Sequence, residues 1–199
     1  MQIGQYQGLP RITIEVGESY VTEKKEEIIS TLLGSCIAAC LYDPVNHIIG
    51  MNHFLLVQQH STHNTNLLSS EAGRYGIHAM ELLINKMLKH GAQRTHLKAK
   101  AFGGGDVLKL SNELHGGKSI GTVNCEFIKT FLNTEHIPLV SFDLGGNTGR
   151  NIFFLAKDFS VYLKRIEPTE ELLSPNKNNI FLKDSSKHTP QPPDPVIYW

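Results

Sequence analysis

The sequence is short of cysteine, has no long hydrophobic run and carries no excess of one charge. Three cysteines, Cys36, Cys40 and Cys125, are too few for a disulfide framework and are typical of a reducing compartment. The 19 basic residues equal the 19 acidic ones, so no positive field favours nucleic acid or an anionic membrane surface. No run of about 18 apolar residues occurs, and the N-terminus MQIGQYQGLPRITIEV has no basic region followed by an apolar one. We therefore predict a cytoplasmic protein without nucleic-acid binding or direct membrane insertion.

The length and composition predict one domain followed by a tail. A chain of 199 residues with 40% hydrophobic content can build a single core. Beyond residue 167 the segments PTEELLSPNKNN and SSKHTPQPPDP lack periodicity and are rich in turn formers. We expect a domain over residues 1–167 and a poorly ordered tail over residues 168–199, whose last residues, 196–199, could still dock on the domain.

Hydrophobic periodicity predicts a mixed α/β fold. Apolar positions of RYGIHAMELLINKMLKHGA fall on one helical face with Gly91 at the C-terminal cap, and TVNCEFIKTFLNTEH predicts a second helix capped by Thr122. A polar loop is expected over residues 58–70. The predicted strands cover residues 11–16, 26–33 and onward to 56, 96–102 and 138–143, with a hairpin formed by 151–157 and 160–166.

The segment TLLGSCIAACLYDPVNHIIGMNHFLL, residues 31–56, predicts an antiparallel hairpin with one reactive side chain on each strand. If Asp43-Pro44-Val45-Asn46 is a turn centred between residues 44 and 45, Cys36 directly faces His53. The same register pairs Ala38 with Met51 and Cys40 with Ile49. Directly opposed side chains share a face of the sheet and lie close enough for a thiol to meet an imidazole.

Such a pair would suit nucleophilic catalysis. The thiolate of Cys36 would attack, and His53 would activate it. Gly34 would let a substrate approach the backbone, and amides near Ser35 and Cys36 could hold an oxyanion. A hydroxyl from Ser30 or Thr31 could orient the imidazole, and strand alternation puts only one of the two on that face.

Other interpretations compete with catalysis. Cysteines on apolar strands are commonly core residues, and we interpret Cys40 and Cys125 in that way. Zinc is an alternative because two cysteines and four histidines lie between residues 36 and 63, but the ligand spacing is poor: Cys36 with Cys40 and His60 with His63 are the only close pairs. The loops FGGGD and DLGGNTGR lack a phosphate-binding pattern and predict strand-end turns. For Arg150 and for the segment Arg74-Tyr75-Gly76 a surface position is expected, although each could line a cleft.

The motifs LGSCIAACLYDP and MNHFLL resemble those of the CheD-type chemoreceptor glutamine deamidases. The resemblance continues in order through RYGIHAMELLINKMLKHGA, LKAKAFGGG, IGTVN and DLGGNTGR, and so covers most of residues 10–165. It implies a single-domain α/β sandwich with mostly antiparallel strands and two main helices, similar to the deamidating bacterial toxins.

The resemblance also implies an activity and partners. The enzyme would hydrolyse selected glutamine side chains of methyl-accepting chemotaxis receptors to glutamate, without a metal or an organic cofactor. Cys36 would be the nucleophile and His53 the base. The third member is a threonine in the family, and its position falls on Ser30, with Thr31 beside it. The alternative is a regulatory module that binds a CheC-type phosphatase.

Overall fold

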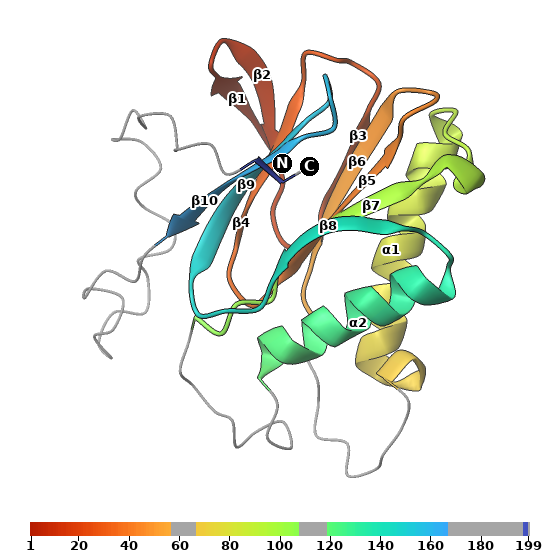
Figure 1. The fold of residues 1–199 in the computed structure, drawn as a ribbon, viewed down its shortest axis with the longest axis vertical. Coiled ribbons are helices and arrows are strands. Elements are labelled where there is room, and N and C mark those ends of the chain that lie inside the picture. The colour runs from red at the N-terminus through yellow and green to blue at the C-terminus, as the bar shows by residue number, and fades with distance from the viewer. Residues whose placement is uncertain (57–66, 108–118, 167–196, 199) are drawn as a thin grey trace.

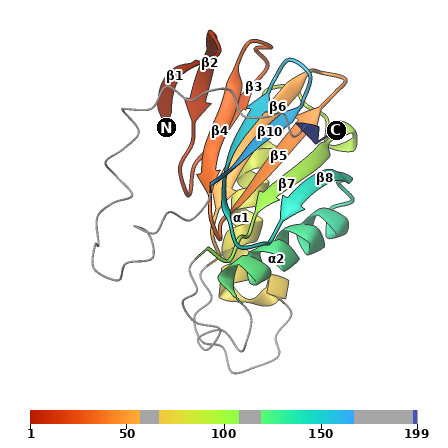
Figure 2. The ribbon, with the colours of Figure 1, turned by 60° about the vertical axis from the view of Figure 1, so that its left-hand side comes forward.

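Two stacked β-sheets form the body of the molecule, and both helices lie against one of them (Figure 1; Figure 2). The coordinates are a computed structural model of the chain, which describes residues 1–56, 67–107, 119–166 and 197–198. The mixed α/β fold with mostly antiparallel strands and two helices is confirmed. No helix among the described residues is long and apolar enough to cross a membrane.

The outer sheet has six strands in the order β1-β2-β4-β9-β10-β11. Only β2 and β4 run parallel to each other, and the other neighbours are antiparallel. Its strands are β1 (Gln2–Tyr6), β2 (Leu9–Thr13), β4 (Ile28–Leu33), β9 (Gly149–Leu155), β10 (Val161–Ile166) and β11 (Ile197–Tyr198).

The central sheet has five strands in the order β3-β6-β5-β7-β8, with β7 and β8 parallel and the rest antiparallel. β5 and β6 are buried along their whole length, as expected for near-continuous apolar runs inside a three-layer molecule. The strands are β3 (Ser19–Thr22), β5 (Ile37–Asp43), β6 (Ile48–Phe54), β7 (Lys98–Gly103) and β8 (Leu139–Leu144).

Helices α1 (Glu71–Lys89) and α2 (Ile120–Thr134) cover the face of the central sheet that points away from the outer sheet. A serine directly before each helix caps its N-terminus. The Ser70 hydroxyl accepts from the amide of Gly73, and the Ser119 hydroxyl accepts from the amide of Thr122. Two short 3-10 helices, η1 (Leu67–Ser69) and η2 (Arg94–His96), flank α1.

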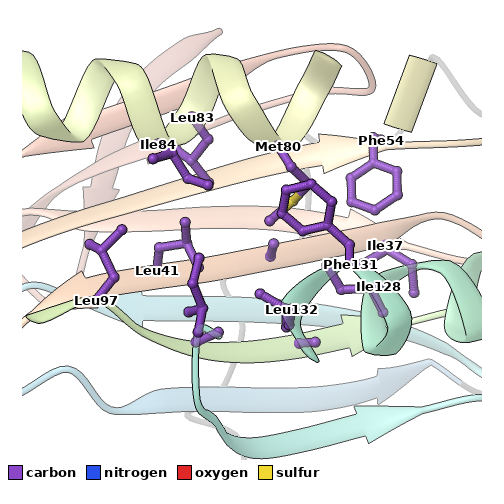
Figure 3. Close-up of a cluster of buried hydrophobic side chains, with 14 of the residues drawn as sticks. Ile37, Leu41, Phe54, Met80, Leu83, Ile84, Leu97, Ile128, Phe131 and Leu132 are labelled. Carbon is purple, nitrogen blue, oxygen red and sulfur yellow. The ribbon is translucent and has the colours of Figure 1, made fainter. Parts of the chain in front are cut away.

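Strand alternation divides the core into two clusters, one on each face of the central sheet. Ile37, Ala39 and Leu41 point toward the helices and pack with Met80, Leu83, Ile128 and Phe131 among others (Figure 3). Ala38 and Cys40 point the other way and join Ile29, Ile152 and Phe154 of the outer sheet. Because both faces of β5 are buried, each of its side chains packs either against the helices or against the outer sheet.

Several expectations change in detail. The second helix is capped by Ser119 rather than by Thr122, because its first turn begins earlier than the apolar pattern indicates. Strands β1 and β3 were not predicted, since both are short, QIGQY is almost wholly exposed, and only the last two residues of SYVT are buried. Most of the predicted loop 58–70 and of the predicted tail 168–199 lies outside the described residues. Within the tail, Ile197 and Tyr198 pair with β10.

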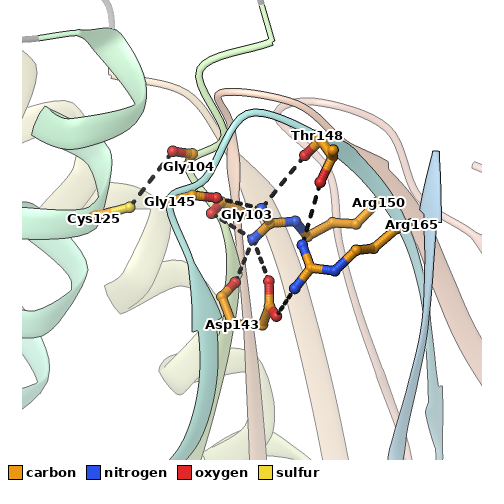
Figure 4. Close-up of polar contacts among 8 residues, drawn as sticks. All are labelled: Gly103, Gly104, Cys125, Asp143, Gly145, Thr148, Arg150 and Arg165. Carbon is orange, nitrogen blue, oxygen red and sulfur yellow. Dashed lines mark hydrogen bonds and ion pairs between the residues drawn. The ribbon is translucent and has the colours of Figure 1, made fainter. Parts of the chain in front are cut away.

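Arg150 of β9 is fully buried, so the expected surface position for it is wrong. Its guanidinium joins the ends of three strands and donates to the carbonyl oxygens of Gly103, Asp143, Gly145 and Thr148 (Figure 4). Its Nη1 also lies 2.7 Å from the Asp143 Oδ1. This one cation thus supplies hydrogen-bond donors to backbone oxygens at the point where the three strands end.

We expect Arg150→Met to lower the free energy of unfolding by about 3 kcal/mol or more. The substitution removes the buried donor from the carbonyl oxygens of the turns and from the Asp143 Oδ1. Arg165→Met is the matched control. Arg165 contacts the same Asp143 carboxylate at 2.6 Å but is 49% exposed, so its loss should cost less than about 1 kcal/mol. Urea unfolding curves of the two variants measure the difference, and equal losses would contradict the assigned role of burial.

Candidate active site

In the hairpin of β5 and β6 the register differs from the predicted one. Each residue of β5 pairs with a residue two positions further along the chain than predicted. Ala38 opposes His53 and Cys40 opposes Met51. The predicted direct pairing of Cys36 with His53 is therefore wrong, as are the predicted partners of Ala38 and Cys40.

The longer turn explains the shift. Asp43 pairs with Ile48, so the loop comprises residues 44–47 rather than two residues. The Asp43 carboxylate accepts from the amides of Val45 and Asn46 at 2.9 and 3.0 Å, and His47 has a positive φ of 58°. Burial raises the pKa of Asp43, but hydrogen bonds from Asn46, Gln93 and Val45 outweigh it and lower the pKa to about 2. The turn is thus built around a charged carboxylate.

A shift of two residues keeps every side chain on its predicted face. Cys36 lies just before β5, on the bend formed by Gly34, Ser35 and Cys36, hereafter the 34–36 bend. It packs against the same inter-sheet cluster that contains Ala38. With Ala38 opposite His53, Cys36 is a diagonal neighbour of the histidine. Diagonal neighbours are about 7–8 Å apart at the backbone, within reach of an aromatic side chain.

Thr31 binds His53 across the space between the two sheets. The Thr31 hydroxyl lies 2.8 Å from the His53 Nδ1 and donates to the Ile14 carbonyl at 2.7 Å. A hydroxyl has one proton, and a carbonyl oxygen can only accept, so toward the imidazole this hydroxyl accepts. Nδ1 therefore carries the ring proton and Nε2 holds the lone pair. Nε2 is buried and has no hydrogen-bond partner among the described residues.

The neighbouring hydroxyl points elsewhere. Ser30 lies on the opposite face of β4 and its Oγ is 3.0 Å from the Thr13 Oγ1, in the outer sheet. Of the two hydroxyls that the sequence left open, the geometry brings only Thr31 to the imidazole.

Burial keeps both reactive groups neutral. It lowers the pKa of His53 to about 4, and it raises the pKa of the Cys36 thiol, against a smaller opposite effect of the Cys36 backbone amide. At neutral pH the pair is a thiol and an imidazole rather than a thiolate and an imidazolium. Proton transfer from Cys36 would accompany attack, which is general-base chemistry.

The 34–36 bend is fixed through its carbonyl oxygens. Those of Gly34 and Cys36 accept from the amides of Gly105 and Gly104 at 2.8 and 2.7 Å. The carbonyl of Ser35 accepts from the Asn124 side chain at 3.2 Å. The backbone near the thiol is therefore attached to β7 and to α2.

The sequence pattern missed this use of the glycine run. An added Cβ at Gly103 would lie 2.0 Å from the Cys36 carbonyl oxygen, and one at Gly104 would lie 2.1 Å from the Cys125 Sγ. Both glycines also have positive φ. The run FGGGD is a strand end, as predicted, and its lack of side chains lets β7 approach the 34–36 bend closely. Three successive glycines at a strand end were the available signal.

The zinc alternative gains no support from the fold. Cys40 is buried in the inter-sheet cluster and His47 packs against Phe159 with its ring tilted, while His60 and His63 lie outside the described residues. Within the described part of the chain, no three His, Cys, Asp or Glu side chains gather as metal ligands.

Comparison with known proteins identifies the family. The family described as CheD chemotactic sensory transduction matches residues 56–165. The chain belongs to the CheD family. It is 46% identical to a probable chemoreceptor glutamine deamidase CheD 2 of Shewanella oneidensis, over 94% of both chains. It is 42% identical to a probable chemoreceptor glutamine deamidase CheD 1 of Geobacter sulfurreducens, over 100% of this chain and 98% of the relative. Among solved structures, YfiH of Bacillus licheniformis covers 63% of this CheD-family chain and 49% of its own length with TM-score 0.38 and 13% identity.

The low pKa of His53 predicts a pH-dependent stability. Below about pH 6.5 the unfolded chain binds a proton on this imidazole that the folded chain binds only near pH 4. Protonation thus favours the unfolded state, and stability falls as the pH falls through this window. Between pH 7 and pH 4.5 we expect the wild type to lose about 2–3 kcal/mol more stability than His53→Gln, which lacks this imidazole.

Urea unfolding of both proteins at the two pH values measures this difference, because contributions from all other groups cancel in it. Parallel losses in wild type and variant would contradict a buried neutral His53.

Proposed function

We propose that this chain hydrolyses glutamine side chains of methyl-accepting chemotaxis receptors to glutamate and releases ammonia. Family membership and the names of the relatives as chemoreceptor glutamine deamidases support this substrate. The observation that carries the chemistry is the oriented imidazole of His53, with Nδ1 on Thr31 and Nε2 without a hydrogen-bond partner among the described residues. The half-buried Cys36 is its diagonal neighbour on the same face of the sheet.

In the first step the Cys36 sulfur attacks the side-chain carbonyl carbon of glutamine while its proton passes to the His53 Nε2. The carbonyl oxygen becomes an oxyanion, which backbone amides of the 34–36 bend stabilise. The imidazolium then gives its proton to the amide nitrogen, the C–N bond breaks and ammonia leaves. A thioester between Cys36 and the former glutamine remains.

In the second step the neutral His53 takes a proton from water, and the resulting hydroxide attacks the thioester. Collapse of the intermediate breaks the C–S bond and yields glutamate, and the proton returns to the sulfur. Thr31 accepts a hydrogen bond from the Nδ1–H throughout and keeps Nε2 aimed at the reacting groups. The Thr31 hydroxyl is neutral, so it leaves the pKa of His53 at the low value that burial produces. A buried carboxylate in that position would raise this pKa.

The CheC-type partner and the cytoplasmic location remain predictions from the sequence. Neither is needed for the chemistry described for Cys36 and His53.

The nucleophile is tested by incubating receptor cytoplasmic domains with the wild type and with Cys36→Ala. We expect glutamine-to-glutamate conversion by the wild type and none above background by the variant, because the variant lacks the attacking sulfur. Peptide mass spectrometry detects the exchange of NH2 for OH. Cys125→Ala is the matched control, since Cys125 is also free and half-buried, and it should stay active. Equal conversion by wild type and Cys36→Ala would exclude the thiol mechanism.

The third member is tested by comparing Thr31→Val with Ser30→Ala. Both hydroxyls are 1% exposed and hydrogen-bonded, but only that of Thr31 contacts His53. We expect Thr31→Val to lower kcat by about 10- to 100-fold, because the imidazole loses the acceptor that orients it, and Ser30→Ala to leave kcat near the wild-type value. Initial rates of receptor deamidation measure both. A loss shared by the two variants would indicate a general packing effect instead.

A further inference from the structure

The side chain of Asn124 is a fully buried cross-link that joins helix α2 to the 34–36 bend before β5 and to Leu56, which follows β6. Its Nδ2 donates to the carbonyls of Ser35 and Ile120 at 3.2 and 2.9 Å, and its Oδ1 accepts from the amide of Leu56 at 2.9 Å. Its exposed fraction is 0%. The partners define the orientation of the amide, because a carbonyl can only accept and an N–H can only donate.

These contacts determine the direction of one peptide group. In a trans peptide the C=O and the following N–H point in opposite directions. The Ser35 carbonyl points to Asn124, so the Cys36 N–H points away from helix α2. The neighbouring carbonyls, of Gly34 and Cys36, are turned toward β7 by the amides of Gly105 and Gly104. Each of the three peptide groups of the 34–36 bend is therefore held by its oxygen.

The Cys36 N–H lies beside its own sulfur, where its effect is to lower the thiol pKa. A donor next to the attacking atom is where a tetrahedral oxyanion forms, since the oxygen and the sulfur are bonded to the same carbon.

We infer that Asn124 is a positioning residue for the oxyanion hole: by holding the Ser35 carbonyl, it directs the Cys36 N–H toward the oxyanion formed on the glutamine side chain. The inference rests on the proposed deamidase function and goes beyond it by assigning a role to a residue that does not touch the substrate. Through Leu56, the same amide also joins the bend to the segment that directly follows β6, the strand of His53.

This role differs from a general packing role in one measurable respect. Attack on an amide develops an oxyanion, whereas alkylation of the same thiol by iodoacetamide displaces iodide and develops none. Alkylation depends on the Cys36 N–H only through the pKa of the thiol. A misdirected Cys36 N–H should therefore slow deamidation far more than alkylation.

The chain provides a matched control in Asn52. This asparagine is 2% exposed and also makes three hydrogen bonds, one within the central sheet and two to a helix. It accepts from the amide of Ala39 and donates to Ala79 and Met80 on α1, without contacting the 34–36 bend. Asn52→Ala thus removes a comparable buried amide one residue from His53.

The experiment measures two rates on full-length wild type, Asn124→Ala, Asn124→Asp and Asn52→Ala. Receptor deamidation gives kcat and KM, and iodoacetamide labelling of Cys36 is followed by mass spectrometry. For Asn124→Ala we expect kcat to fall by about 10²-fold, with KM near wild type and a much smaller fall in the labelling rate of Cys36. Asn124→Asp keeps the shape but loses the amide donors, and should behave alike. Asn52→Ala should retain kcat.

Cys40 serves as an internal reporter of folding, because its exposed fraction is 0% and only an unfolded variant exposes it to iodoacetamide. If Asn124→Ala is labelled at Cys40, the shape-conserving Asn124→Asp decides. An unchanged kcat in the folded variant, an equal fall in deamidation and labelling, or the same selective loss in Asn52→Ala would each overturn the inference. Failure of the wild type to deamidate receptors, or full activity of Cys36→Ala, would instead overturn the proposed function.

Discussion

The contact between the two sheets is the constraint on which the site depends. Thr31 belongs to the outer sheet and His53 to the central sheet, and the hydrogen bond between them exists only because the sheets stack with these positions facing each other. The same stacking buries both groups, which keeps the imidazole neutral and leaves its Nε2 unprotonated. Packing of the apolar residues between the sheets thus sets the position and the protonation state of His53 together.

A second layer of contacts holds the backbone around the thiol. The 34–36 bend has no regular strand partner, and its carbonyl oxygens are taken by Gly104, Gly105 and Asn124. The glycine segment is in turn held by the buried guanidinium of Arg150, which gathers the carbonyls at the ends of β7 and β8 (Figure 4). Rigid support of this kind is what a reacting peptide group needs, because small displacements of an oxyanion donor are costly.

Local patterns predicted most elements but not how far each extends. The helix with Gly91 at its end and the hairpin of β9 and β10 follow from periodicity and capping, which act over a few residues. The predicted register of β5 and β6 was wrong by two residues, because the Asp43 carboxylate organises a four-residue loop that the Asp-Pro pair alone does not indicate. Arg150 was expected at the surface, since nothing in DLGGNTGR indicates that the surrounding turns present inward-facing carbonyls.

By itself the sequence determined that Cys36 and His53 share one face of the sheet, and its motifs pointed to the CheD family. Alternation with a period of two puts Cys36 and His53 on one face in either register, so that conclusion survives the shift. Only the tertiary structure decided between Ser30 and Thr31 as the partner of His53, and only it brought Asn124 to the 34–36 bend. Both contacts join segments far apart in the chain, and such contacts depend on how sheets and helices pack rather than on any local spacing.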